Sequence, residues 1–363
     1  MLERLSLSGF KTIRHLDGLE LGSMNVLIGQ NGAGKSNLLS FFRMLSQMFS
    51  PPGNLQIFVA RGGGATSLLH GGASVTPEIA ATLNFLDVDY QLRLAHAAQD
   101  TLVFSEEAIS CRIPSDDRIA WIPWGGGHRE SILAQATDLP FVENESALRT
   151  FLRECIVFHL HNTSETARIR QRWSVTDSLV LKEDGANLAP FLLRLRERHP
   201  AHYRRITETL RQIAPFFADF ELVLESDTVL LRWRELGNDL VFGPHQASDG
   251  TLRAMALVAL LMQPGEQMPS IIILDEPELG LHPRAISVLA GLLQTASMHS
   301  QVIVATQSPV LLDHFEPEQV IVAEREGAES VFRRLDRFTL EAWLEEYTLS
   351  DLWDKNVLGG RPR

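Results

Sequence analysis

Residues 25–39 of the chain are Asn25-Val26-Leu27-Ile28-Gly29-Gln30-Asn31-Gly32-Ala33-Gly34-Lys35-Ser36-Asn37-Leu38-Leu39. The run 26–28 is continuously apolar, as is typical of a parallel strand that is buried on both faces. From Leu38 onward the apolar residues recur with a helical period. The segment between them has the spacing Gly-x-x-x-x-Gly-Lys-Ser. We therefore predict a strand, a tight loop and a helix.

The predicted loop has the chemistry of a phosphate-binding site. Its glycines allow positive φ angles, so that amide N–H groups and the helix N-terminus can point at phosphate oxygens. The Lys35 ammonium adds a charge for the β- and γ-phosphates, and the Ser36 hydroxyl is a ligand for Mg²⁺. A glycine-rich turn that matches by accident is the alternative, and the strand and helix signals on its flanks argue against it. The predicted phosphate-binding residues are Gly29, Gln30, Asn31, Gly32, Ala33, Gly34, Lys35, Ser36 and Asn37.

A second predicted strand, 271–274, ends in two carboxylates. The four apolar residues place Asp275 at the carboxyl end of a buried strand, which is the edge where α/β sheets bind ligands. There Asp275 can hold Mg²⁺ through water, opposite Ser36. Glu276 is placed to orient or deprotonate an attacking water. The alternative is an acidic pair that faces a loop after an ordinary strand.

The tetrapeptide Ser248-Asp249-Gly250-Thr251 opens an apolar helix that is predicted to run through Met262. A serine cap and a glycine amide at a helix N-terminus form an anion site, although ordinary capping explains the same residues. Because the phosphate loop already serves the γ-phosphate within one subunit, we expect Ser248 and Gly250 to face the nucleotide of another subunit.

Together these motifs resemble the ABC-type ATPases of the SMC/RecF and overcoming-lysogenization-defect group. The small stand-alone bacterial ATPases that are often assigned to the AAA family are the most similar members. The segments that carry the resemblance, in the order found in that group, are 9–13, 29–36, 248–251, 275–283 and 306–309. The middle of the chain, about 51–242, is similar to the group only in general layout.

The resemblance implies an α/β fold: a P-loop NTPase with an ABC-type head, a mixed central sheet, an antiparallel β subdomain and a helical insertion. It also implies a homodimer that sandwiches two ATP molecules, with Ser248 and Gly250 of one protomer at the γ-phosphate held by Lys35 of the other. Glu276, Gln307 and Lys35 are then the catalytic candidates. Ser36 and Asp275 are the candidate Mg²⁺ ligands.

Two glutamines bear on how such a head works. Gln307 stands where the group usually has a histidine as the γ-phosphate sensor. Glutamine can donate an amide N–H but carries no charge, so the substitution bears on the hydrolysis rate more than on binding. Gln56 is the candidate for the glutamine that links the nucleotide to the helical part, with an ordinary surface glutamine as an equally good alternative.

Three parts are expected along the chain. Residues 1–147 form the N-terminal lobe, in which 2–13 is a strand, 79–113 alternates as antiparallel hairpins and 121–127 is rich in turns. Residues 148–215 form a helical, Arg-rich insertion. Residues 216–363 form the C-terminal lobe.

The charge of the chain is distributed unevenly. The formal net charge is −12, whereas residues 148–215 carry +5 and the remainder carries −17. The insertion is therefore the candidate for contact with nucleic acid or a protein partner, and a solvated helix face with ordinary ion pairs is the equal alternative. No module with a base-reading signature is present.

Composition limits the remaining classes. With 363 residues and 45% hydrophobic residues the chain can build a full core, and no apolar run approaches the roughly 20 residues that span a bilayer. Cys111 and Cys155 stand far apart, so a disulfide framework or a zinc site is not expected. His159 and His161 share one face of a strand, but they lack a third ligand in the sequence and are interpreted as structural. We expect a cytoplasmic protein without membrane segments.

The sequence therefore predicts a Mg²⁺-dependent ATPase that dimerises around two ATP molecules and drives a conformational cycle in DNA repair or phage defence. The alternative is a nucleotide-gated sensor with little hydrolysis that controls a separate nuclease or effector protein. A transporter ATPase subunit is disfavoured by the Ser-Asp-Gly signature and by the segment 278–283.

Overall fold

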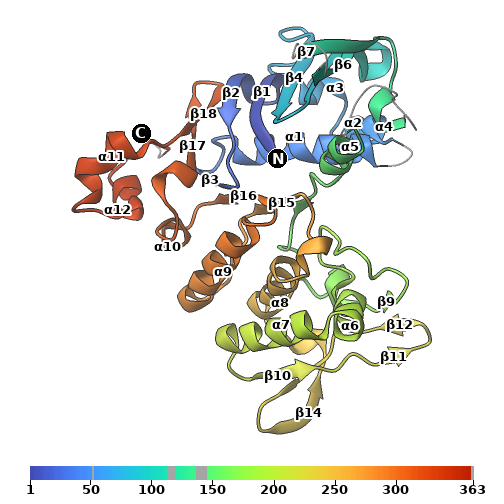
Figure 1. The fold of residues 1–363 in the computed structure, drawn as a ribbon, viewed down its shortest axis with the longest axis vertical. Coiled ribbons are helices and arrows are strands. Elements are labelled where there is room, and N and C mark those ends of the chain that lie inside the picture. The colour runs from blue at the N-terminus through green and yellow to red at the C-terminus, as the bar shows by residue number, and fades with distance from the viewer. Residues whose placement is uncertain (51–52, 113–118, 136–144, 361–363) are drawn as a thin grey trace. The chain divides into compact units, whose positions relative to one another are not determined.

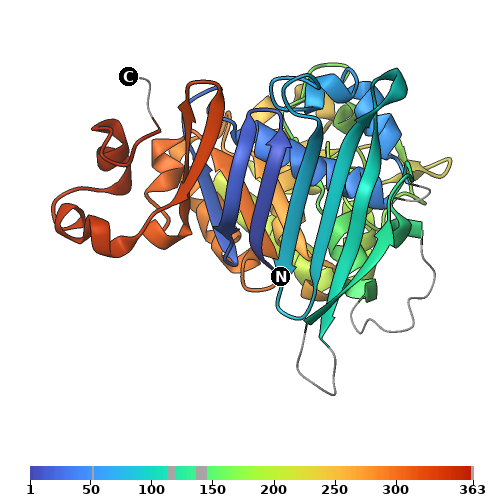
Figure 2. The ribbon, with the colours of Figure 1, turned by 90° about the horizontal axis from the view of Figure 1, so that it is seen from above.

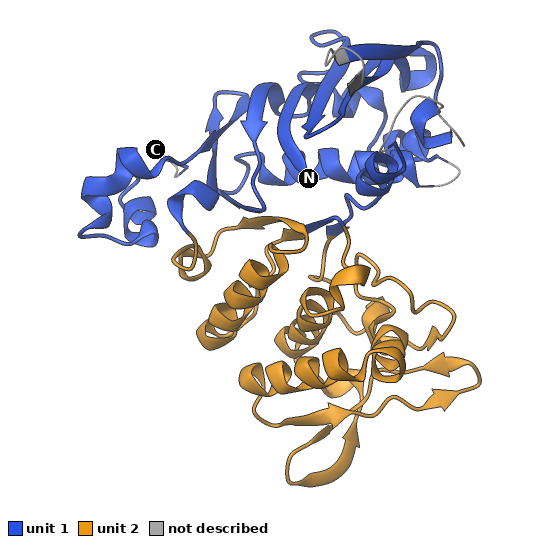
Figure 3. Cartoon of the chain, viewed as in Figure 1, with its two compact units in different colours: residues 1–157, 270–273, 316–363 blue, residues 158–269, 274–315 orange. Residues whose placement is uncertain are grey.

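The structure is a computed structural model that describes residues 1–50, 53–112, 119–135 and 145–360. The chain divides into two compact units (Figure 3). Unit 1 comprises residues 1–157, 270–273 and 316–363, and unit 2 comprises residues 158–269 and 274–315. The ribbon in Figure 1 labels the helices and strands of both units.

Unit 1 contains a six-stranded antiparallel sheet with the order β2-β1-β4-β5-β6-β7. Figure 2 shows its strands side by side, coloured from blue to green. The strands are β1 (Leu2–Phe10), β2 (Ile13–Glu20), β4 (Glu78–Phe85), β5 (Asp89–Ala97), β6 (Thr101–Arg112) and β7 (Ile119–Gly125). The period-two pattern predicted the hairpins of β4, β5 and β6, and this prediction is confirmed. Apolar residues alternate with solvated ones on these strands, which leaves one face for the core.

Two predictions about this sheet are wrong. Residues 2–13 are not one strand, because Lys11 adopts a left-handed φ of 49° and turns the chain from β1 into β2. The segment 121–127, expected to be turns, largely belongs to β7, which pairs with β6 from Ile119 opposite Arg112 to Gly125 opposite Glu107. In both places a neighbouring strand supplies the hydrogen bonds, and this pairing is not visible in local composition.

The helices of unit 1 include the one that follows the phosphate loop, α1 (Lys35–Phe49). Its apolar face packs on the antiparallel sheet, where Phe41 meets Phe10 and Phe49 meets Tyr90, both with ring centroids 5.8 Å apart. The other helices of this unit are α2 (Leu55–Arg61), α3 (Ala65–Leu68), α4 (Ile132–Gln135), α5 (Glu145–Arg153), α11 (Arg337–Leu344) and α12 (Leu349–Asp354).

The buried strand β3 (Met24–Ile28) leads into the phosphate loop, as predicted. It pairs in parallel with β17 (Val320–Glu326), with Val26 opposite Val320. β17 pairs antiparallel with β18 (Glu329–Arg334). β18 was not expected, because polar and charged residues surround its two apolar positions and mask the strand pattern.

Unit 2 holds the second set of motifs. The predicted helix after Ser248 is α8 (Asp249–Leu261) and the predicted strand 271–274 is β15 (Ile271–Asp275), so both are confirmed within a residue or so at each end. The unit also contains α9 (Pro283–Ala296) and β16 (Gln301–Thr306). β16 neighbours β15, and β15 neighbours β8 (Val157–Phe158). The last two residues of β15 and the last of β8 belong to unit 2. α10 (Pro309–Leu312) follows β16.

The rest of unit 2 only partly follows the predicted helical insertion. α6 (Leu188–Arg198) and α7 (Pro200–Ile213) are confirmed, with Pro200 at the start of α7. Residues 157–187 instead form turns and short strands. The short strands of this unit are β9 (Trp173–Ser174), β10 (Phe217–Phe220), β11 (Leu224–Glu225), β12 (Thr228–Val229), β13 (Trp233–Glu235) and β14 (Asn238–Phe242).

Short 3-10 helices complete the chain: η1 (Ala98–Asp100), η2 (Arg168–Arg170), η3 (Pro244–Gln246), η4 (Gly265–Gln267) and η5 (Pro317–Gln319). Among the described residues, no helix has the length and apolar character needed to cross a membrane.

Candidate functional site

The phosphate loop in unit 1 joins β3 to α1 with three glycines in positive-φ conformations. The φ angles are 152° at Gly29, 81° at Gly32 and 109° at Gly34, which is the N-cap of α1. A Cβ on Gly29 would stand 2.3 Å from the Ala323 carbonyl oxygen, and one on Gly34 would stand 2.0 Å from Ser330 Oγ. Glycine is therefore required at both positions by strands β17 and β18 as well as by the backbone conformation.

Lys35 is the buried cation of this loop. Its side chain is 5% exposed, and Nζ donates to the carbonyl oxygens of Gly29 at 2.5 Å and Gln30 at 3.4 Å. The ammonium is thus held at the loop, where a phosphate oxygen can replace weaker carbonyl contacts. Asn31, Gly32 and Ser36 are exposed.

Three other residues of the loop take part in bonds within unit 1. The Asn37 amide donates to Thr12 Oγ1 at 2.6 Å, which ties the start of α1 to the turn after β1. The backbone N–H of Gln30 donates to the Gly360 carbonyl at 2.9 Å, and that of Ala33 donates to the Gln30 carbonyl.

The acidic edge in unit 2 lies at the end of β15. The Asp275 side chain is 17% exposed and directly follows four buried apolar residues. Glu276 then leaves the strand with a positive φ of 43°, and its backbone N–H donates to the Ala305 carbonyl at 2.8 Å. A left-handed conformation at a non-glycine residue is unfavourable, and such strain is concentrated at functional sites.

Gln307, which follows β16, holds the Glu276 carboxylate with two hydrogen bonds. Its side-chain Nε2 donates to Oε1 at 2.9 Å and its backbone N–H donates to Oε2 at 3.0 Å. Two of the three catalytic candidates are therefore in direct contact. The bonds fix the orientation of the carboxylate while leaving it acceptor sites for a water.

A third carboxylate, Glu278, joins this pair and was assigned no chemistry from the sequence. It is 7% exposed, and its Oε1 accepts a hydrogen bond from Thr306 Oγ1. Burial and the nearby Glu276 carboxylate raise the pKa of Glu278 to about 7. Below about pH 7, Glu278 therefore mostly holds a proton beside Glu276, as expected when two carboxylates share a site.

The signature segment lies at the start of α8. Ser248 is exposed and caps the helix, its Oγ accepting from the Thr251 N–H at 3.1 Å. The buried Arg170 side chain contacts this segment. It donates to the Asp249 carboxylate at 3.0 Å and to the carbonyl oxygens of Pro244 and Ala247. The structure thus gives Arg170 a positioning role that its place in an Arg-rich stretch did not reveal.

Gln56 has a structural function. Its side-chain amide donates to the carbonyl oxygens of Leu102 and Arg129, both at 2.8 Å, and so fastens α2 to β6 within unit 1. These hydrogen bonds do not support a role for Gln56 in linking the nucleotide to the helical part. They also show that Gln56 is not an ordinary surface glutamine.

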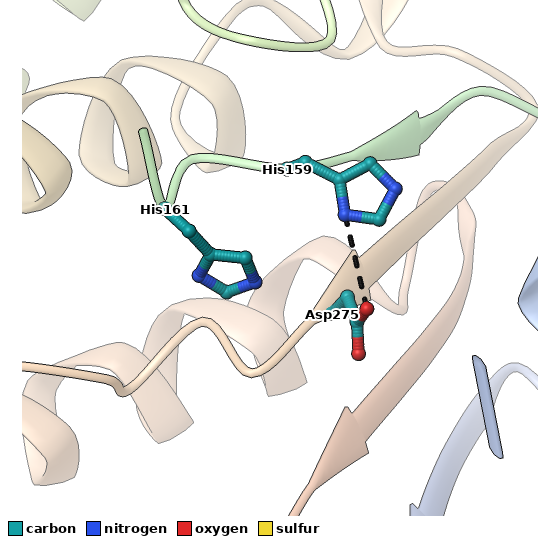
Figure 4. Close-up of side chains that lie close together, drawn as sticks. All are labelled: His159, His161 and Asp275. Atoms are coloured by element: carbon teal, nitrogen blue, oxygen red, sulfur yellow. Dashed lines mark ion pairs between the residues drawn. The ribbon is translucent and has the colours of Figure 1, made fainter. Parts of the chain in front are cut away.

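The interpretation that His159 and His161 lack a third ligand is wrong. One ligand atom each of His159, His161 and Asp275 lie within 4.8 Å of one another (Figure 4). The third residue was missed because it lies 114 positions further along the chain, and only the pairing of β8 with β15 brings it there. Burial lowers the pKa of His161. His282 instead caps α9, its Nδ1 accepting from the Arg284 N–H.

Most arginines of the predicted basic insertion are engaged. Besides Arg170, Arg168 pairs with Asp184 and Arg172 pairs with Glu225. Arg194, Arg196 and Arg211 donate to oxygens of Gln267, Leu222 and Ala218. The exposed arginines of residues 148–215 without an ion pair to any described residue are Arg153, Arg198, Arg204, Arg205 and Arg211.

Comparisons with known proteins identify the family and the fold of the chain. The family model described as "AAA domain, putative AbiEii toxin, Type IV TA system" matches residues 24–313. A search of curated proteins gave no match. Among solved structures, an Smc head bound to the C-winged helix domain of ScpA has a TM-score of 0.55 at 17% identity, covering 93% of this chain and 99% of its own. An Smc head from Pyrococcus furiosus with an extended coiled coil, bound to the C-terminal domain of ScpA, has a TM-score of 0.54 at 15% identity and covers 95% and 98%. The predicted α/β, ABC-type P-loop fold is confirmed.

Proposed function

Because the chain belongs to the AAA-domain family of putative AbiEii toxins, we propose that it is an ATPase that binds ATP with Mg²⁺ and uses hydrolysis to reset a conformational state. The observation that carries the proposal is the pair of hydrogen bonds from Gln307 to Glu276 at the end of a buried strand. The same chain holds a complete phosphate loop. ATPases need a phosphate cradle and a positioned base, which the phosphate loop and Glu276 would supply.

The phosphate loop would bind the triphosphate. Lys35 would exchange its contacts with the loop carbonyls for the β- and γ-phosphate oxygens, and the backbone N–H groups of 29–37 would surround the same charge. The space beside Gly32 is open, because a Cβ built there would have no heavy atom within 4 Å. A ligand can therefore come close to the backbone at this position. The loop residues therefore fit ATP.

The Ser36 hydroxyl and the Asp275 carboxylate each have the chemistry of a magnesium ligand, and we propose that both bind the ion. Ser36 is exposed at the first turn of α1, and Asp275 presents a carboxylate at a strand end. One hydroxyl, one carboxylate and phosphate oxygens make up a common ligand set for Mg²⁺. When bound, Mg²⁺ would neutralise charge on the β- and γ-phosphate oxygens.

We assign the role of general base to Glu276. Gln307 would hold this carboxylate in one orientation, and its amide would also be placed as the neutral counterpart of the usual histidine sensor. Below about pH 7, where Glu278 is mostly protonated, it would add no second negative charge beside the reacting phosphate.

The exposed Ser248 favours an ATP-dependent homodimer. A capping serine at a solvent-facing helix N-terminus is available to a γ-phosphate on a second protomer. The solved Smc heads that share the fold were bound to domains of ScpA, which supports a protein partner for this chain as well. A separate nuclease or effector, in DNA repair or in phage defence, fits the toxin–antitoxin description of the family.

The second candidate function is a nucleotide-gated sensor with little hydrolysis. It is favoured by Gln307, which carries no charge. In this structure the Gln307 amide donates to the candidate base Glu276, whereas a γ-phosphate sensor would donate to the phosphate. Steady-state phosphate release with ATP and Mg²⁺ separates the two functions. We expect turnover that Glu276→Gln abolishes; ATP binding without turnover in the wild type would favour the sensor.

A further inference from the structure

The end of β8 and the end of β15 bring two imidazoles to one carboxylate within unit 2. His159 directly follows β8, and its backbone N–H donates to the Glu183 carbonyl at 2.8 Å. His161 lies two residues further on, in the turn after β8, and one of its ring nitrogens also faces Asp275 (Figure 4). His159 Nδ1 lies 3.8 Å from Asp275 Oδ2.

This histidine segment is held by α8. Arg253, which is 5% exposed, donates from Nε to the Leu160 carbonyl at 3.1 Å and from a terminal nitrogen to the His161 carbonyl at 3.5 Å. The backbone that carries both rings is therefore fastened on both sides, to Glu183 and to Arg253. Because this backbone is held in place, the distances between the rings and the carboxylate can change only by rotation of the side chains.

The two nitrogens of His161 have different surroundings. Its Nδ1 is buried and has no hydrogen-bond partner among the described residues. Figure 4 shows Nδ1 on the side of the ring away from Asp275, so Nε2 is the nitrogen that His161 turns toward the carboxylate. The ring is tilted 51° to that of His159, with the centroids 6.2 Å apart, so the two rings do not stack on each other.

We propose that His159, His161 and Asp275 bind a divalent transition-metal ion of the zinc and cobalt class, without any nucleotide. Imidazole nitrogens prefer these ions, whereas Mg²⁺ prefers oxygen ligands alone. Two histidines and one carboxylate form a three-ligand set that leaves further positions for water or a phosphate oxygen.

The distances allow this coordination after small side-chain movements. The three ligand atoms now lie within 4.8 Å of one another. An ion about 2.0–2.2 Å from each would bring tetrahedral ligands to about 3.3–3.6 Å apart. Rotations that move each atom by roughly 1 Å close the difference. The three side chains are half-buried, so water can reach the ion.

The proposal goes beyond the ATPase assignment, because Asp275 would bind a transition-metal ion as well as Mg²⁺. A transition metal at the histidines would occupy the carboxylate that we assign to Mg²⁺. The two ions would therefore compete at Asp275, and millimolar Mg²⁺ should weaken transition-metal binding without abolishing it.

The test is a titration of the nucleotide-free, chelator-treated protein with Co²⁺, followed by visible absorption and by calorimetry. We expect one ion per chain with nitrogen-ligand absorption bands. His161→Gln and Asp275→Asn should each weaken binding at least tenfold. His245→Gln removes an exposed histidine outside the cluster and should bind Co²⁺ as the wild type does.

Circular dichroism melts of each variant check that it is folded. Absence of Co²⁺ binding by the wild type, or equal binding by the wild type and folded His161→Gln, would overturn the metal site. ATP binding is measured separately, in Mg²⁺ and with Lys35→Ala as its negative control. Failure of the metal site and failure of the ATPase assignment are therefore distinguishable.

Discussion

Gly250 of the signature lies against the backbone of Gly280, in the turn that follows the acidic strand. A Cβ built on Gly250 would stand 2.5 Å from the Gly280 carbonyl oxygen. Gly280 itself has a φ of +79°, and a Cβ there would stand 2.9 Å from a terminal nitrogen of Arg253. The start of α8 and the segment 276–282 are thus packed backbone to backbone within unit 2. A displacement of the start of α8 must therefore move the segment 276–282, because a backbone carbonyl cannot rotate away as a side chain does.

Substitution of Gly250 should therefore destabilise the protein despite the helical position. Glycine to alanine in a helix normally stabilises by about 0.5–1 kcal/mol. In Gly250→Ala the clash with a backbone oxygen should outweigh this gain and cost about 1–3 kcal/mol. Gly291→Ala is the matched control, since a Cβ there meets no heavy atom within 4 Å in α9. Thermal unfolding should show opposite signs for the two variants; a stabilised Gly250→Ala would contradict the close contact.

Lys35→Ala should abolish nucleotide binding. The substitution removes the buried ammonium that contacts the loop carbonyls of Gly29 and Gln30. The loop keeps its amide N–H groups but loses its charge for the β- and γ-phosphates. Calorimetry with ATP and Mg²⁺ measures the effect, and Lys355→Ala, outside the loop, is the control. An unchanged ATP affinity in folded Lys35→Ala would disprove the phosphate-site assignment.

Glu276→Gln should keep ATP binding, lower turnover by about 10²–10⁴-fold and accumulate an ATP-bound dimer. The amide preserves size but cannot accept a proton from water. It also leaves only one oxygen for the two donors of Gln307, so some reorientation is expected. Phosphate release measures turnover and light scattering measures the dimer. If this variant remains monomeric with ATP and Mg²⁺, the sandwich dimer is wrong.

The sequence predicted the parts of the site that are contiguous along the chain. The phosphate loop, the strand that ends in Asp275 and the helix after Ser248 each carry their structural and chemical signals within about 15 residues. Gln307 was identified by its position after the last core strand, although its bonds to Glu276 required the pairing of β16 with β15.

The parts that sequence reasoning missed depend on distant contacts. Glu278 is buried beside Glu276 in the turn after β15, and this burial raises its pKa although the hydrogen bond from Thr306 lowers it. Arg170 looked like one more surface cation, yet it is buried beneath the signature 79 residues away. The cluster around His159 needs the order of strands in the sheet, which no local pattern contains.

The raised pKa of Glu278 predicts a pH dependence of stability. In the unfolded chain the carboxyl loses its proton near its ordinary pKa of 4.5, whereas the folded protein retains it up to about pH 7. Between these values the folded state binds the extra proton, so raising the pH across this window lowers the free energy of unfolding. The loss should be about 3 kcal/mol and complete above pH 7.

Glu278→Gln keeps the hydrogen-bonding capacity toward Thr306 and removes the titration. Chemical denaturation at pH 5 and pH 8 should therefore show a smaller fall in stability for the variant than for the wild type. Equal falls in the two proteins would mean that Glu278 does not carry the proton.

The last prediction concerns contact with nucleic acid, which the structure narrows to a smaller set of arginines. Arg168 and Arg172 are paired with carboxylates, and reversing the charge of the nearly buried Arg170 would disrupt the signature rather than test binding. Arg204 and Arg205, on the exposed face of α7, have no ion pair to a described residue. They are therefore free to neutralise phosphates.

If they do so, the logarithm of the DNA affinity should fall linearly with the logarithm of salt concentration, and Arg204→Gln/Arg205→Gln should reduce that slope by about two units. The loss should be alike for every sequence, because phosphate contacts carry no base information. Arg168→Gln/Arg172→Gln is the matched control: it also removes two charges, but from arginines already neutralised by Asp184 and Glu225, so its slope should change less. Fluorescence anisotropy at several salt concentrations, with ATP present, measures both variants. Equal slopes for the wild type and the α7 variant would mean that DNA contacts another part of the protein. If the wild type does not bind DNA at low salt, we would interpret these arginines as a surface for a protein partner.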